Sequence, residues 1–140
     1  MLRNLSCAVL VAVMLGGCWG CGTQKDVSGA RTAVTQFHAD LNNENYDAIY
    51  SQADQRFRDA SKQPDFEALM KAIHKKLGPV QDAKPLGFFV NYNTSGTQIR
   101  LTYKTKFAEG DAEEEFVWSK SGTNYELLGY HINSNALITK

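Results

Sequence analysis

The apolar positions between residues 27 and 77 repeat with the period of an α-helix and form three stripes. The first stripe is spaced by 3, 4, 3 and 4 residues and consists of Val27, Ala30, Val34, Phe37 and Leu41. The second predicts a shorter helix with an irregular end and consists of Tyr46, Ile49, Tyr50, Ala53 and Phe57. The third consists of Phe66, Leu69, Met70, Ile73 and Leu77. The folded part of the chain is therefore expected to begin with three amphipathic helices.

Start and stop signals flank these stripes. Asp26 or Ser28 is a suitable N-cap for the first helix, and the polar run 42–45 ends it. Pro64 and Asp65 open the third helix. Gly78 and Pro79 close it, because glycine accepts a left-handed cap and proline cannot continue the helix.

After Pro85 the period changes from 3.6 to 2. Residues 86–93 read as a strand, and after a turn at 94–96 residues 97–107 alternate without a fault. One face of the first strand holds Phe88, Val90 and Tyr92; one face of the second holds Ile99, Leu101, Tyr103, Thr105 and Phe107. Strict alternation indicates one buried and one wet face, which is typical of an antiparallel sheet.

Two glycines predict the remaining hairpins. A two-residue turn at Glu109-Gly110 sets the first register, in which the expected pairs are Lys106–Glu113, Lys104–Glu115, Tyr103–Phe116 and Leu101–Trp118. A turn at Ser121-Gly122 sets the second, with the expected pairs Trp118–Tyr125, Phe116–Leu127 and Glu114–Gly129. The predicted fold class is α+β, with N-terminal helices packed on one face of a curved four-stranded antiparallel sheet.

The N-terminus has the pattern of a secretory signal peptide. Arg3 is followed by nine apolar residues at 7–15, too few to span a membrane. The segment Leu15-Gly16-Gly17-Cys18 resembles the bacterial lipobox, which implies cleavage after Gly17 and acylation of the Cys18 thiol. We therefore expect a signal peptide at 1–17, a lipidated tether at 18–27 and one domain at 28–140.

Other roles of the two cysteines, Cys18 and Cys21, are disfavoured. A thioredoxin-like C-x-x-C motif needs a βαβ context, and a zinc site needs two further ligands, whereas no cysteine follows Cys21. Cys21 is expected to be an inert tether residue, with an intermolecular disulfide or a second acylation as alternatives.

Charge excludes one class of partner. Removing residues 1–17 takes away Arg3 and leaves 14 basic against 15 acidic residues, so the mature chain has a net charge of −1. A nucleic-acid binder would show a basic excess. The expected partners are the lipid bilayer, through acylated Cys18, and either an envelope protein or a small apolar ligand. Trp19, which follows the lipidated cysteine, favours the outer membrane facing the periplasm over the inner membrane.

The order of elements resembles the nuclear transport factor 2-like, or cystatin-like, superfamily. The opening "AVTQFHADLNNENYDAIYSQADQRFR" is similar to that of small bacterial lipoproteins of unknown function in that group. The resemblance implies a cone whose helices and concave sheet face enclose a pocket. The superfamily contains isomerases and dehydratases as well as non-enzymes, so the fold alone does not assign a function.

The expected register places Glu114 and His131 on the inward face as diagonal neighbours, about 7–8 Å apart by Cα. Such a pair is a candidate general acid and base, and Tyr103 adds a phenol for polarising a carbonyl. His38 and His74 are interpreted as boundary residues of their helices.

No catalytic triad, zinc-protease motif or phosphate loop is present in the sequence, so we expect neither a cofactor nor a metal. The sequence favours a non-enzymatic interaction or ligand-binding module in the cell envelope. The alternative is a small isomerase or dehydratase that uses Glu114 and His131.

Overall fold

The structure is a computed structural model that describes residues 21–139. The expected signal peptide and Cys18 lie outside the described residues. The described elements are α1 (Cys21–Asn42), α2 (Tyr46–Ser51), α3 (Gln55–Ala60), α4 (Gln63–Leu77), β1 (Val80–Asn93), β2 (Gly96–Phe107), β3 (Gly110–Ser121), β4 (Asn124–Asn133) and α5 (Asn135–Thr139).

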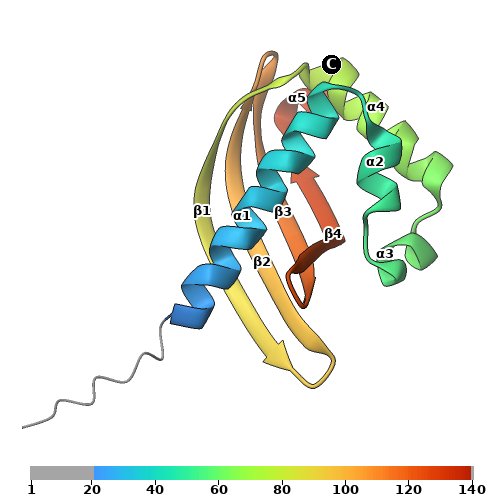
Figure 1. Cartoon of the computed structure of the whole chain (residues 1–140). Coiled ribbons are helices and arrows are strands. Elements are labelled where there is room, and N and C mark those ends of the chain that lie inside the picture. Colours follow the sequence, from blue (N-terminus) through green and yellow to red (C-terminus); the bar gives the residue numbers. More distant parts are fainter. Residues whose placement is uncertain (1–20, 140) are drawn as a thin grey trace, which may run out of the picture.

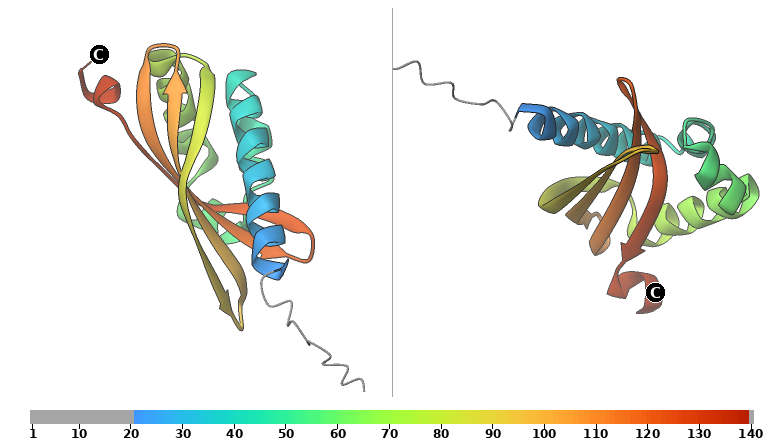
Figure 2. Two further views of the ribbon diagram at one scale, coloured as in Figure 1. Left: turned by 90° about the vertical axis from the view of Figure 1, so that its left-hand side faces the viewer. Right: turned by 90° about the horizontal axis from the view of Figure 1, so that it is seen from below.

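The four strands pair antiparallel in the order β1-β2-β3-β4, so the sheet is an open meander with two edges. Figure 1 shows α1 lying across the curved sheet, with α2, α3 and α4 grouped beside it. The side view in Figure 2 shows how strongly the sheet twists. The predicted fold class, helices followed by a curved four-stranded antiparallel sheet, is confirmed.

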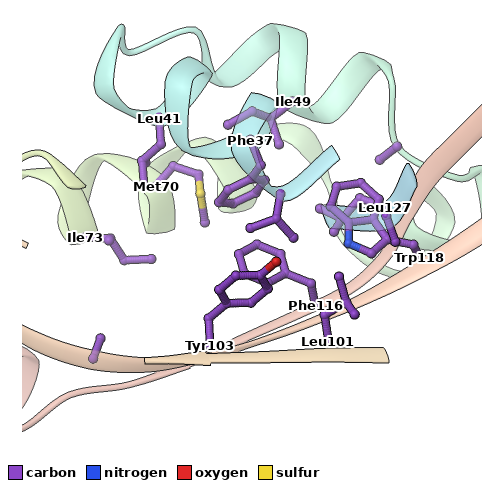
Figure 3. Close-up of a cluster of buried hydrophobic side chains, with 14 of the residues drawn as sticks. Phe37, Leu41, Ile49, Met70, Ile73, Leu101, Tyr103, Phe116, Trp118 and Leu127 are labelled. Carbon is purple, nitrogen blue, oxygen red and sulfur yellow. The ribbon is translucent and has the colours of Figure 1, made fainter. Parts of the chain in front are cut away.

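The core lies between the helices and the inward face of β2 and β3 (Figure 3). All five residues of the first predicted stripe are buried, and so are the five inward residues of β2. The third stripe is buried except for Leu69, which is half exposed. The helical and strand periods in the sequence therefore predicted the core faces of α1, α4 and β2.

Helix α1 begins earlier than the sequence predicted. It starts at Cys21, so neither Asp26 nor Ser28 is its N-cap, and residues 21–27, expected in the tether, are helical. The Asp26 carboxylate is buried and receives a hydrogen bond from Lys120 Nζ at 2.8 Å and one from Tyr92 Oη at 3.3 Å. These contacts tie the first turns of α1 to the sheet.

The second predicted helix is two helices. Its stripe is interrupted at residues 52–54, where α2 ends and Asp54 caps α3 by accepting a hydrogen bond from the backbone N–H of Arg56 at 2.9 Å. The break also docks the helices on the sheet, because the backbone N–H of Asp54 donates to the carbonyl of Leu127 in β4 at 2.9 Å.

Strand β1 starts at Val80, before the Pro85 from which the sequence predicted a strand, and it contains two bulges. Phe88 and Tyr92 lie on the expected face but are 50% and 55% exposed. β1 is an edge strand of the sheet.

The first predicted hairpin register is wrong by two residues. The turn is Ala108-Glu109, so Lys104 faces Glu113 and Tyr103 faces Glu114. The cause is a tertiary contact, since the turn's two backbone N–H groups donate to the carbonyls of residues 79 and 77 at the end of α4. A shift of two keeps every side chain on its predicted face, and lysines still face acidic residues.

The second predicted register is also wrong. The turn lies at Gly122-Thr123, so Trp118 faces Leu127, and a β-bulge follows at Val117/Trp118. A bulge adds one residue to a strand and so exchanges its two faces beyond that point. Phe116 therefore faces Tyr130, and the inward positions at the end of β4 become 130 and 132.

We predict that Asp54→Ala lowers the free energy of unfolding by about 1 kcal/mol at pH 7, the usual effect of losing an N-cap. The hydrogen bonds from Arg56 hold the pKa of Asp54 far below its usual 3.8. A carboxylate with a depressed folded-state pKa stabilises the fold above its unfolded value and loses that effect as the pH falls. Urea denaturation from pH 7 to pH 2 should show the difference from wild type shrinking below about pH 4.

Asp59→Ala, an exposed change on the same helix α3, is the matched control and should cost no more than about 0.5 kcal/mol. An Asp54→Ala difference that is unchanged down to pH 2 would contradict this account of the cap.

Candidate functional site

Glu114 is a fully buried carboxylate at the centre of the sheet, on the inward face of β3. Three side chains from three other elements reach it. His38 Nε2 of α1 lies 2.8 Å from Oε2, Thr105 Oγ1 of β2 donates to Oε2 at 2.5 Å, and Tyr130 Oη of β4 donates to Oε1 at 2.6 Å. We call these four residues the Glu114 network.

The network supplies the hydrogen bonds that Glu114 cannot form with water, because the residue is buried. An ionised carboxylate only accepts hydrogen bonds and has about four acceptor positions, so it accommodates all three donors. Charge-assisted hydrogen bonds of this kind are about twice as strong as neutral ones. The arrangement offsets part of the large cost of burying a carboxylate.

Tyr130 is held in its donor form. Burial is the largest cause that raises its pKa well above the usual 10.0, and the negative charge of Glu114 and the hydrogen bond to it act in the same direction. The phenol therefore keeps its proton over the whole physiological range and donates to the carboxylate throughout.

The predicted acid–base pair does not form. His131 is exposed and faces Glu115, while Glu114 faces Ile132 rather than Gly129. The β4 bulge is the physical reason, because it exchanged the faces that the unbroken alternation assigned. Tyr103 is buried directly opposite Glu114, but its ring packs edge-on against Phe116, with centroids 6.0 Å apart, and burial raises its pKa.

The interpretation of His38 as a boundary residue is also wrong, since it is buried against Glu114. A signal was present in the sequence: His38 follows Val34 by four residues and precedes Leu41 by three, so it belongs to the buried stripe. His74 does lie at a boundary, where it is part-buried with Nδ1 3.9 Å from a carboxylate oxygen of Glu44.

Aromatic rings seal the Glu114 network. Phe116 is fully buried and contacts the rings of Phe37, His38 and Tyr130 at centroid distances of 5.1, 5.6 and 5.2 Å. Figure 3 shows Phe37 and Phe116 in this packed layer between the helices and the sheet. The network is thus enclosed in the core, and its arrangement suits holding elements together.

A cleft of about 550 Å³ lies elsewhere, between α1, the end of α2 and the β3–β4 hairpin. Its walls are mainly apolar, and the largest such side chains are Phe37, Ile49, Trp118, Tyr125 and Leu127. Neither Glu114 nor His38 lines it. Volumes of about 300–1,000 Å³ are typical of small-molecule sites.

Two details of the cleft wall stand out. Within residues 21–139, Trp118 Nε1 is the one buried side-chain nitrogen or oxygen without a hydrogen-bond partner. Tyr125 lies directly on the backbone of α1 at Gly29, where a Cβ atom would come within 2.3 Å of the phenol ring. Gly29 therefore allows Tyr125 to form one end of the cleft.

The described residues contain no cluster of three or more His, Cys, Asp or Glu side chains suited to a metal ion. In the same part of the chain, no helix has the length and apolar character needed to cross a bilayer. Cys21 is an exposed free thiol at the start of α1.

A family model described as "Protein of unknown function (DUF4019)" matches residues 33–130, from within α1 to within β4. The matched segment contains the whole Glu114 network and the β3–β4 hairpin. No curated protein matches the chain.

We predict that Glu114→Ala lowers the free energy of unfolding by about 3–5 kcal/mol, because it leaves the buried His38 and Thr105 and the part-buried Tyr130 without their partner. Glu115→Ala, one residue along β3, is the matched control. Its carboxylate is 3.6 Å from Arg100 on the outward face, and losing such an exposed pair costs about 1 kcal/mol or less. Urea denaturation of both variants measures the two values, and equal losses would contradict the role given to the network.

Proposed function

We propose that this chain, which belongs to the DUF4019 family of proteins of unknown function, is a lipid-anchored envelope protein whose domain binds a small, largely apolar ligand. We further propose that its fold is of the nuclear transport factor 2-like, or cystatin-like, type. The helices that precede a curved antiparallel meander support this finer assignment.

The anchor follows from the N-terminal sequence. The lipobox-like residues 15–18 provide a thiol for acylation, and α1 begins only three residues later, at Cys21. Stable attachment needs more than one acyl chain, which lipoprotein processing supplies. We place the domain at the outer membrane, facing the periplasm.

The cleft is the observation that carries the binding function. It has the size of a small-molecule site, and its mainly apolar walls include the side chains of Phe37, Trp118 and Tyr125. Concave, mainly apolar sites of this volume with a few polar groups are the usual form of small-molecule sites in proteins. A module that only binds its ligand needs such a cleft and no catalytic residues.

The enzymatic alternative is less well supported. It required Glu114 and His131 to converge on one point in a cavity, and the structure places them on opposite faces of the sheet. Glu114 instead takes part in an enclosed network that joins four elements. Binding without chemistry is therefore the function that this geometry favours.

We predict that Cys18→Ser leaves the protein unlipidated and with its signal peptide attached. Intact-mass analysis of membrane extracts gives the answer directly, because cleavage removes 17 residues and acylation adds a defined mass. Cys21→Ser is the matched control and should be processed normally. A processed, membrane-retained form of Cys18→Ser would refute the anchor.

We also predict that the full-length protein, extracted from its native membrane, retains a ligand that native mass spectrometry detects as one extra mass. Gly29→Ala should lose much of this occupancy, because the new methyl group displaces Tyr125 from the cleft wall.

Gly22→Ala is the matched control on the same helix, since a Cβ atom there meets nothing within 4 Å, and it should retain the ligand. Both variants should remain folded by circular dichroism. A bare polypeptide mass for the wild-type protein would count against ligand binding and would turn attention to protein partners.

A further inference from the structure

We infer that the cleft selects an organic cation, an amine or quaternary ammonium that carries an apolar body. The inference rests on the proposed function, in that a small molecule occupies the cleft. It adds the sign of the charge, which the proposed function leaves open.

The charges of the cleft wall have one sign. Asp40 of α1 and Glu126 of β4 are part-buried, and none of the described residues that line the cleft is Lys, Arg or His. The remaining polar side chains of the wall are amides and threonine hydroxyls. An anionic ligand would meet two carboxylates and no compensating cation.

Neither carboxylate is neutralised from within the described part of the chain. Asp40 accepts a hydrogen bond from the amide of Gln36 at 3.1 Å, and no ion pair is formed there. Glu126 feels the charge of Arg56. That guanidinium is held by Asp54, however, with hydrogen bonds of 2.9 and 2.8 Å. A ligand cation would therefore find both carboxylates available.

Aromatic side chains complete the site. Phe37, Trp118 and Tyr125 come from α1, β3 and β4 and all contribute to the wall. The face of an aromatic ring attracts a cation within about 6 Å of its centre, most strongly when the site is partly desolvated. Rings combined with carboxylates form the usual surroundings of quaternary ammonium groups in proteins.

A charge series of probes with one apolar body tests the inference. The probes are benzyltrimethylammonium, benzyl alcohol and phenylmethanesulfonate, titrated into the full-length protein in phosphatidylcholine nanodiscs. Trp19 and Trp118 are the two tryptophans of the chain, so Trp19→Phe makes Trp118 fluorescence the reporter. We expect the cation to bind at least about tenfold more tightly than the neutral probe, a difference of about 1.4 kcal/mol, and the sulfonate more weakly than either.

Two substitutions locate the charge effect. Asp40→Asn and Glu126→Gln should each lower the affinity for the cationic probe about fivefold, which is the size expected for a partly exposed ion pair. Neither substitution should change the affinity for benzyl alcohol. Asp47 is an exposed carboxylate on α2 outside the cleft wall, so Asp47→Asn should change the affinity for neither probe. Added salt should lower the affinity for the cationic probe and leave the affinity for benzyl alcohol unchanged.

The outcomes separate the two proposals. Equal affinity for the cation and benzyl alcohol, or tighter binding of the sulfonate, overturns the inference and leaves the binding function in place. Cation binding that neither Asp40→Asn nor Glu126→Gln weakens also overturns it. If no probe binds and native mass spectrometry finds no retained ligand, the inference and the proposed function fail together.

Discussion

The arrangement of this domain depends on the burial of one carboxylate. Glu114 has no contact with solvent, so its hydrogen-bond partners must come from the protein, and they lie on α1, β2 and β4. This requirement fixes the rotation of α1 over the sheet, because only one face presents His38. It also fixes the phase of β4, because the bulge must precede Tyr130. Apolar packing alone would tolerate several such arrangements, whereas a buried charge does not.

Residue patterns predicted the parts of the fold that depend on local periodicity. The stripe from Val27 to Leu41 and the alternation from Ile99 to Phe107 identified the buried faces, since each follows from the geometry of one element. The predicted hairpin registers were wrong where tertiary contacts determine the pairing of the strands. Pairing of Lys104 with either Glu113 or Glu115 satisfies the same charge pattern, and the end of α4 selects the first.

The candidate site was harder to predict for a similar reason. One inserted residue at the bulge moved His131 outward and Tyr130 inward, and nothing in the alternation of β4 marks that insertion. Glu114 was correctly placed on the inward face, because its strand is regular up to that point. The cleft was not predictable, since its walls come from α1, α2 and a hairpin whose register depends on distant contacts.

The attachment of α1 also has a consequence for the order in which the protein assembles. The sheet consists of three consecutive hairpins, each of which closes a short loop and forms at low entropic cost. His38 and Glu114 are 76 positions apart in the chain, so docking of α1 closes a far longer loop. The helix that completes the polar network is also one wall of the cleft. Docking of α1 and formation of the cleft are therefore the same event, and a ligand that contacts both walls of the cleft would stabilise the packing of segments that lie far apart in the chain.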